Sequence, residues 1–235
     1  MSSNSNTRTN RRSNGNGSTP KKTNPKRLFW ICTLLFILIV AGGGCGFISA
    51  TLSNLPDVSN VRPSASSQIY DVHGNLITTV HSTENRLPVP LKDVPKDLQN
   101  AFVATEDSRF YTHHGIDPIG ILRAVWVNIV HSGVSEGGST ITQQLARNAF
   151  LSQDRTLKRK ISEALLALKI EQHYTKDEIL EMYMNQIYFG QGAYGVQSAS
   201  HVYFGKDASE LTLAQAALIA GLPQSPNYYL SLIHI

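Results

Sequence analysis

The sequence contains only two cysteines, Cys32 and Cys45, and both lie in one apolar run. A small disulfide-stabilised domain needs several paired cysteines, and a structural zinc site needs a cluster of Cys or His ligands. The positions of these two cysteines therefore exclude both arrangements. A core of apolar side chains must stabilise the fold instead, and the 41% content of hydrophobic residues is sufficient for one.

Acidic residues are missing from residues 1–27, where seven of the 21 basic residues lie. The rest of the chain holds 14 basic and 17 acidic residues. The pI of about 9.1 therefore reflects the tail, and we expect no nucleic acid partner for the folded part. The tail is rich in Asn, Ser, Thr and Gly, a composition typical of disorder.

Charged residues are also missing from residues 28–50. A helix of that length, at about 1.5 Å per residue, would span about 34 Å, enough to cross a hydrocarbon core of about 30 Å. The basic tail predicts a single-pass helix with a cytoplasmic N-terminus and everything after residue 50 outside. A cleaved lipoprotein signal ending at Gly42–Cys45 is the alternative, but Gly42 stands where such a site usually has an aliphatic residue.

Beyond a predicted spacer at 51–67, alternating residues at 68–72 and 76–80 predict a β-hairpin. Helical periodicity follows from Val94, with Asp97 as an expected cap, and we expect a mainly α fold. Three helix starts show the capping-box pattern: Thr140 with Gln143, Thr175 with Glu178, and Thr212 with Gln215. The helix from 155 to about 173 has its expected core face at Leu157, Ile161, Leu165 and Leu168, and the last helix should end at Gly221.

Three segments carry groups suited to catalysis. The first, 104–117, contains Glu106 and Arg109, which at this spacing could equally be an exposed ion pair. The second, 133–148, is a glycine-rich loop before a helix, whose free N–H groups could hold an anion, although Ser139 replaces the lysine of a nucleotide-binding loop. The third, 155–163, places cations beside Glu163, as a surface salt-bridge ladder also would.

Five segments together resemble the ordered motifs of the peptidoglycan glycosyltransferase domain of class A penicillin-binding proteins. They are Glu106–Gly115, Gly138–Gln144, Arg159–Glu163, Ile179–Gly190 and Leu211–Pro223. The resemblance covers residues 68–229 and implies a lysozyme-like α fold with a hydrophobic lobe embedded in a bacterial cell membrane. It implies lipid II as acceptor and a lipid-linked glycan chain as donor, joined by a β-1,4 bond with inversion. Membrane lipids and other cell-wall synthesis proteins are the further partners it implies.

The resemblance also assigns roles to residues. Glu106 would be the general base, and Glu163 would assist departure of the pyrophosphate, directly or through a divalent cation, Mg²⁺ or Mn²⁺. Arg147, Arg159 and Lys160 would face the pyrophosphate. The remaining implied substrate-binding residues are Asp107, Phe110, His113, Gly138, Ser139, Thr140, Gln143, Gln144 and Asn185.

Two departures from the family pattern remain. Gln215 stands where the family commonly has Glu, and we interpret it as part of a capping box. The family continues into a transpeptidase domain, of which no trace follows residue 229, so we expect a truncated domain with residues 230–235 not native. A membrane-anchored lytic glycosidase and an inactive cell-wall binding module are the alternative functions.

Overall fold

The structure, a computed structural model, describes residues 46, 49–59, 67–74, 76–80, 85–131, 137–152, 154 and 156–226. The predicted basic tail, nearly all of the predicted membrane helix and residues 230–235 lie outside this part. No helix among the described residues is long and apolar enough to cross a membrane. The chain divides into two units, Met1–Ala50 and Thr51–Ile235, and the strands and helices named below belong to the second.

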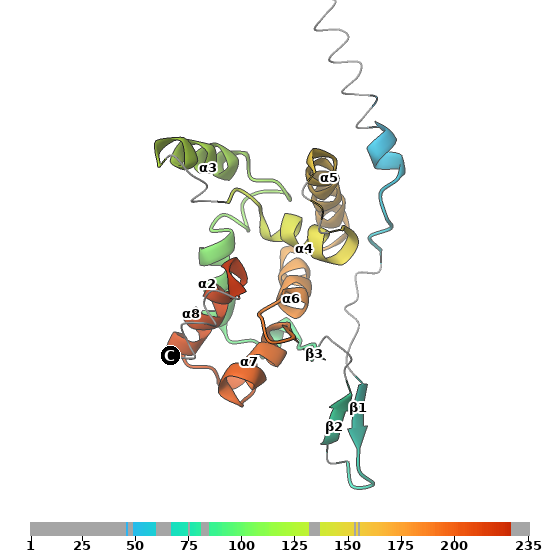
Figure 1. Ribbon diagram of the computed structural model, residues 1–235, viewed down its shortest axis with the longest axis vertical. Coiled ribbons are helices and arrows are strands. Elements are labelled where there is room, and N and C mark those ends of the chain that lie inside the picture. The colour runs from blue at the N-terminus through green and yellow to red at the C-terminus, as the bar shows by residue number, and fades with distance from the viewer. Residues whose placement is uncertain are drawn as a thin grey trace, which may run out of the picture. The chain divides into compact units, whose positions relative to one another are not determined.

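Two short pairs of strands accompany the helices (Figure 1). The predicted hairpin is confirmed: β1 (Ser67–Tyr70) pairs antiparallel with β2 (Leu76–Val80). Asp71 accepts a hydrogen bond from the His73 N–H at 2.8 Å in the turn. The second pair is parallel and joins distant parts of the chain, β3 (Asn85–Arg86) and β4 (Ala193–Tyr194).

Helices dominate the described residues, as predicted. They are α2 (Lys96–Glu106), α3 (Pro118–Val130), α4 (Ile141–Phe150), α5 (Leu157–His173), α6 (Lys176–Gln186), α7 (Val196–Phe204) and α8 (Leu213–Gly221), with 3-10 turns η1 (Leu91–Asp93), η2 (Ala208–Glu210) and η3 (Leu222–Gln224). All three predicted capping boxes are present, at the starts of α4, α6 and α8. The expected cap of α2 is wrong, because Pro95 is the N-cap and Asp97 lies inside the first turn.

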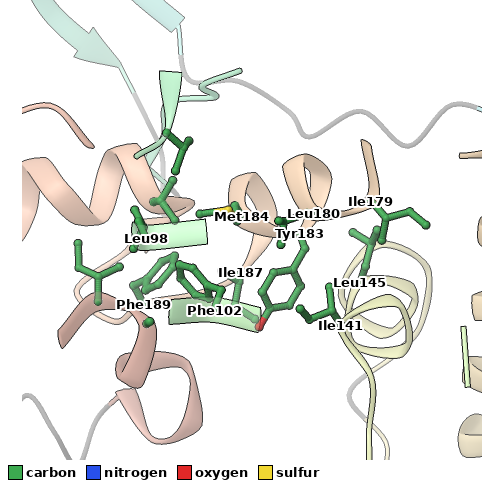
Figure 2. Packing of buried hydrophobic residues seen from close by; sticks show 14 of the residues in the cluster. Leu98, Phe102, Ile141, Leu145, Ile179, Leu180, Tyr183, Met184, Ile187 and Phe189 are labelled. Atoms are coloured by element: carbon green, nitrogen blue, oxygen red, sulfur yellow. The ribbon is translucent and has the colours of Figure 1, made fainter. Parts of the chain in front are cut away.

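The core lies where α2, α4 and α6 meet (Figure 2). Phe102 of α2 packs edge-on against Tyr183 of α6 and against Phe189, each at 6.0 Å between ring centroids. Figure 2 shows the Tyr183 ring between the Phe102 side of this cluster and Ile141 of α4. This packing holds the end of α2 close to the start of α4.

The predicted core face of α5 is wrong. Leu157, Ile161 and Leu168 are exposed, at 85%, 36% and 38%, and Leu165 is half-buried, whereas the buried face carries Leu166, Ala167 and Ile170. The helix therefore leaves an apolar face open. The same is true of α3, where seven large apolar side chains are exposed: Ile119, Ile121, Leu122, Val125, Trp126, Ile129 and Val130.

The described part of the predicted spacer, residues 51–59, packs on the helices. Val58 is fully buried and belongs to the core cluster. The Tyr174 hydroxyl donates to the Val58 carbonyl at 2.8 Å, and Lys169 Nζ donates to the Pro56 carbonyl at 3.2 Å. An apolar contact and two hydrogen bonds therefore clamp this segment to the C-terminal part of α5.

Candidate active site

Glu106 is the last residue of α2 and is half-buried at the edge of the core. Gln144 of α4 donates from Nε2 to Glu106 Oε2 at 2.8 Å. Burial raises the pKa of Glu106 above its ordinary value, while the Gln144 hydrogen bond and the charge of Arg147 oppose that rise. The two predicted residues Gln144 and Arg147 therefore act directly on the predicted base.

Asp107 follows Glu106 and caps the end of α2. His113 Nε2 lies 3.0 and 2.9 Å from the two Asp107 carboxylate oxygens, and the Ile141 N–H donates to the same carboxylate at 3.1 Å. The expectation that the first N–H groups of α4 are free for an external anion is therefore wrong at Ile141, because Asp107 occupies that position. His113 is buried against Asp107, so it is more than an exposed turn residue.

The segment before α4 is held by close packing and by capping. A Cβ at Gly138 would lie 3.1 Å from the Ile121 Cα of α3, a tighter contact than most side chains make, so the segment before α4 passes close to α3 at this position. Thr140 Oγ1 donates to the Gly115 carbonyl at 2.7 Å, and Gln143 Oε1 accepts from the Thr140 N–H at 3.0 Å. Thr140 and Gln143 thus position the site, and both side chains are buried.

A second charged cluster forms on the first turns of α5. The Glu163 side chain is fully buried and accepts from Arg159 at 2.8 Å and from Lys160 at 2.6 Å. Lys160 Nζ also donates to Ser139 Oγ at 2.8 Å, which joins the cluster to the segment before α4. Arg159 Nε is buried without a hydrogen-bond partner. In this cluster two cations therefore pair with one buried carboxylate, and the Arg159 Nε–H group has no hydrogen-bond partner.

Two predicted substrate-binding residues have other roles. Phe110 is fully buried, with Lys176 Nζ 4.5 Å from its ring centroid, so it is a core residue. The Asn185 amide is fully engaged by main-chain groups, exchanging two hydrogen bonds of 2.8 Å with Val89. Arg109 pairs with Asp117, not with Glu106 as the simplest sequence interpretation suggested.

One residue at this site was not predicted. The Tyr183 hydroxyl of α6 donates to Gln144 Oε1 at 3.3 Å. Burial raises the pKa of Tyr183 well above its ordinary value, and the nearby Glu106 carboxylate adds to the rise. The sequence places Tyr183 on the same helix face as Leu180 and Met184, which is why it resembled an ordinary core residue.

A divalent cation has no preformed protein site among the described residues. No three His, Cys, Asp or Glu side chains gather there. Both oxygens of Glu163 are taken by Arg159 and Lys160, and the Asp107 carboxylate is taken by His113 and Ile141. In the part of the chain that the structure describes, the Glu163 and Asp107 carboxylates therefore do not form a site for a resident metal ion.

A hollow of about 580 Å³ lies elsewhere, beside η1 and the start of α2. Lys92, Lys96, Gln99 and Asp177 are among the residues that line it. None of the predicted catalytic or substrate-binding residues does so. The hollow is therefore separate from the charged clusters of α2, α4 and α5.

Comparison with known proteins gives consistent matches. Residues 73–234 match the family described as Transglycosylase. The chain is 50% identical to penicillin-binding protein 1A of Escherichia coli (strain K12), over 86% of this chain and 24% of that protein. It is 43% identical to penicillin-binding protein 1F of Bacillus subtilis (strain 168), over 91% of this chain and 30% of that protein.

A crystal structure of penicillin-binding protein 1A from Haemophilus influenzae is 30% identical, covering 70% of this chain and 15% of that chain. Its TM-score of 0.33 is too low for a comparison of folds. The chain spans about a quarter of the length of the curated relatives it matches.

Proposed function

This chain belongs to the transglycosylase family, and from that premise we propose that it is a peptidoglycan glycosyltransferase. It would polymerise lipid II into glycan strands through β-1,4 bonds, with inversion at the anomeric carbon and release of undecaprenyl pyrophosphate. One observation carries the proposal: the half-buried Glu106 carboxylate at the end of α2 and the cationic cluster on α5 are both hydrogen-bonded to the first turns of α4 and the segment before it. The same part of the chain therefore positions the proposed base, Glu106, and Lys160 of the cluster that would stabilise the leaving group.

Glu106 is the base in this proposal. Inverting sugar transfer needs a group that takes the proton from the acceptor 4-hydroxyl as the new bond forms. A carboxylate whose pKa is raised by burial is a stronger base than an exposed glutamate. Gln144 offers its amide to only one of the two oxygens, Oε2, and fixes the direction in which the carboxylate points.

Arg159 and Lys160 stabilise the departing pyrophosphate. Charge accumulates on the phosphate oxygens as the bond to the sugar breaks, and preorganised cations stabilise that charge most effectively. The Lys160 side chain is 44% exposed and the Arg159 side chain is 17% exposed, so both cations can reach an anion at the surface of the cluster. Glu163 keeps the two cations in place. The divalent cation stays a prediction, and no step is assigned to it.

The membrane supplies the lipid substrates in this proposal. The seven exposed apolar side chains of α3 form a face with a single charged residue on the helix, Arg123. Exposed apolar patches of this kind mark interaction surfaces, and amphipathic helices bind at bilayer interfaces. We extend the proposal to a lysozyme-like fold, with α3 in the outer leaflet and residues 28–50 as a membrane anchor whose N-terminus is cytoplasmic.

The test is polymerisation of labelled lipid II by the full chain in detergent or vesicles. Glu106→Gln keeps the shape of the side chain and removes the base, so we expect the rate to fall by about 10²- to 10⁴-fold. Glu210→Gln is the matched control, because Glu210 is exposed on η2. Retention of more than about a tenth of the rate by Glu106→Gln would refute the assignment.

The lytic glycosidase alternative is favoured by one feature, the raised pKa of Glu106, which a catalytic acid also requires. A glycosidase has no need of the α5 cations, because its leaving group carries no phosphate. The same assay separates the two: growth of glycan chains supports the transferase, and shortening of preformed glycan supports the glycosidase. Binding without either reaction would indicate an inactive module.

A further inference from the structure

Tyr183 places a hydroxyl deep inside an otherwise apolar cluster. Its side chain is fully buried, and the ring packs edge-on against Phe102. Among the described residues, Gln144 Oε1 is the one hydrogen-bond partner of this hydroxyl. Phenylalanine would fill the same space without a polar atom, so packing alone does not account for a tyrosine here.

Three side chains from three helices lie in a row. Tyr183 on α6 donates to Gln144 on α4, and Gln144 donates to Glu106 at the end of α2. The Gln144 amide has two ends with opposite hydrogen-bonding character. Because the Tyr183 hydroxyl engages the oxygen end, the N–H end faces the carboxylate.

We infer that Tyr183 is a positioning residue that acts through Gln144: it keeps the amide oriented to donate to the ionised Glu106 carboxylate. The inference rests on the proposed role of Glu106 as base and adds a residue that does not touch the substrate. Both dipoles in the row, the hydroxyl and the amide, point their positive ends toward the carboxylate, so the ionised form gains more from them than the neutral form.

The row is also compatible with the state after proton transfer. Gln144 donates to Oε2, so the acceptor sugar's 4-hydroxyl gives its proton to the other oxygen of Glu106, Oε1. The protonated carboxyl still accepts the Gln144 hydrogen bond at Oε2, and the Tyr183 hydroxyl keeps its own proton and its acceptor. The only proton that moves is the one from the sugar.

Two other charged residues act on Glu106, and neither belongs to the hydrogen-bonded row. Asp107 follows it in the chain, and Arg147 faces it from α4. The helix α8 packs on α2 and has no ionisable side chain. A Tyr183→Phe substitution therefore changes the hydrogen-bonded row and leaves the surrounding charges in place.

The test is the pH dependence of lipid II polymerisation by the full chain. In Tyr183→Phe we expect the acidic limb of the rate profile to move upward by up to about one pH unit, because the ionised carboxylate loses an oriented donor. Tyr203→Phe is the matched control: its hydroxyl donates to the Phe189 carbonyl at 2.8 Å, away from Glu106, and its acidic limb should not move. A folded Tyr183→Phe enzyme with an unmoved limb would overturn the inference.

A second variant covers the case in which Tyr183→Phe does not fold. Gln144→Met removes the amide from the row at similar length, so its acidic limb must also move upward, and an unmoved limb overturns the inference. When Tyr183→Phe is added to Gln144→Met, the double variant should show no further movement. The test also separates failure of this inference from failure of the proposed function. If Glu106 is not the base, Glu106→Gln remains active. If Glu106 is the base but Tyr183 does not position Gln144, Glu106→Gln is inactive and Tyr183→Phe has the wild-type pH profile.

Discussion

Replacement of Glu163 by Gln should destabilise the fold, because the Glu163 carboxylate forms ion pairs with two cations, Arg159 and Lys160. Its side chain is fully buried, whereas Arg159 is 17% and Lys160 44% exposed. Removing one partner of a fully buried ion pair costs about 3 to 5 kcal/mol. Water reaches Lys160 and part of Arg159, so the loss should be smaller, about 2 to 3 kcal/mol, and should come mainly from Arg159.

Thermal unfolding of the purified protein measures this loss. A change of 1 kcal/mol moves the Tm of a domain of this size by about 2 to 4 °C, so Glu163→Gln should lower the Tm by about 4 to 12 °C. The exposed Glu210→Gln control should stay within about 0.5 kcal/mol of wild type. A double-mutant cycle with Arg159→Gln should give a coupling of about 1 to 3 kcal/mol.

A Tm shift below about 1 °C, together with a coupling near zero, would refute the buried pair. Glu163 would then be free to act in the reaction without holding the cations. A lowered Tm combined with a polymerisation rate reduced by orders of magnitude is the outcome that the site geometry supports, because loose cations stabilise a departing pyrophosphate poorly.

Three further predictions concern packing and protonation. Gly138→Ala should cost about 1 to 3 kcal/mol in denaturant unfolding, whereas Gly221→Ala, with open space around its Cβ, should be close to neutral. Val58→Ala should cost about 1 to 3 kcal/mol, and Val72→Ala, 95% exposed, almost nothing. Glu106→Gln should raise the Tm at pH values above the raised pKa of Glu106, where the half-buried wild-type carboxylate is ionised at a cost, and this gain should disappear as the pH falls through that pKa toward the ordinary glutamate value; a Tm difference independent of pH would contradict it.

The features that the sequence predicted correctly are local ones. A capping box is complete within four residues, so Thr140 with Gln143 and Thr175 with Glu178 could be recognised without knowledge of their surroundings. The hairpin at 67–80 and the end of α8 at Gly221 depend on equally short patterns. Their physical cause lies in the backbone groups of neighbouring residues, which every fold must satisfy.

The features that could not be predicted depend on which surfaces meet. The Leu157, Ile161 and Leu168 face of α5 has the spacing of a core face, and periodicity does not say whether protein or another apolar phase covers it. The partner of Arg109 is Asp117, and the anion at the start of α4 is Asp107, 34 residues before Ile141. Such pairings follow from the packing of helices, and one sequence does not contain that information.

The clamp at Val58 has a mechanical consequence within the second unit. The Pro56 carbonyl accepts from Lys169 on α5, and the Val58 carbonyl accepts from Tyr174 just beyond the end of that helix. A force applied through residue 51 would therefore reach the C-terminal part of α5, the helix whose first turns carry Arg159 and Lys160.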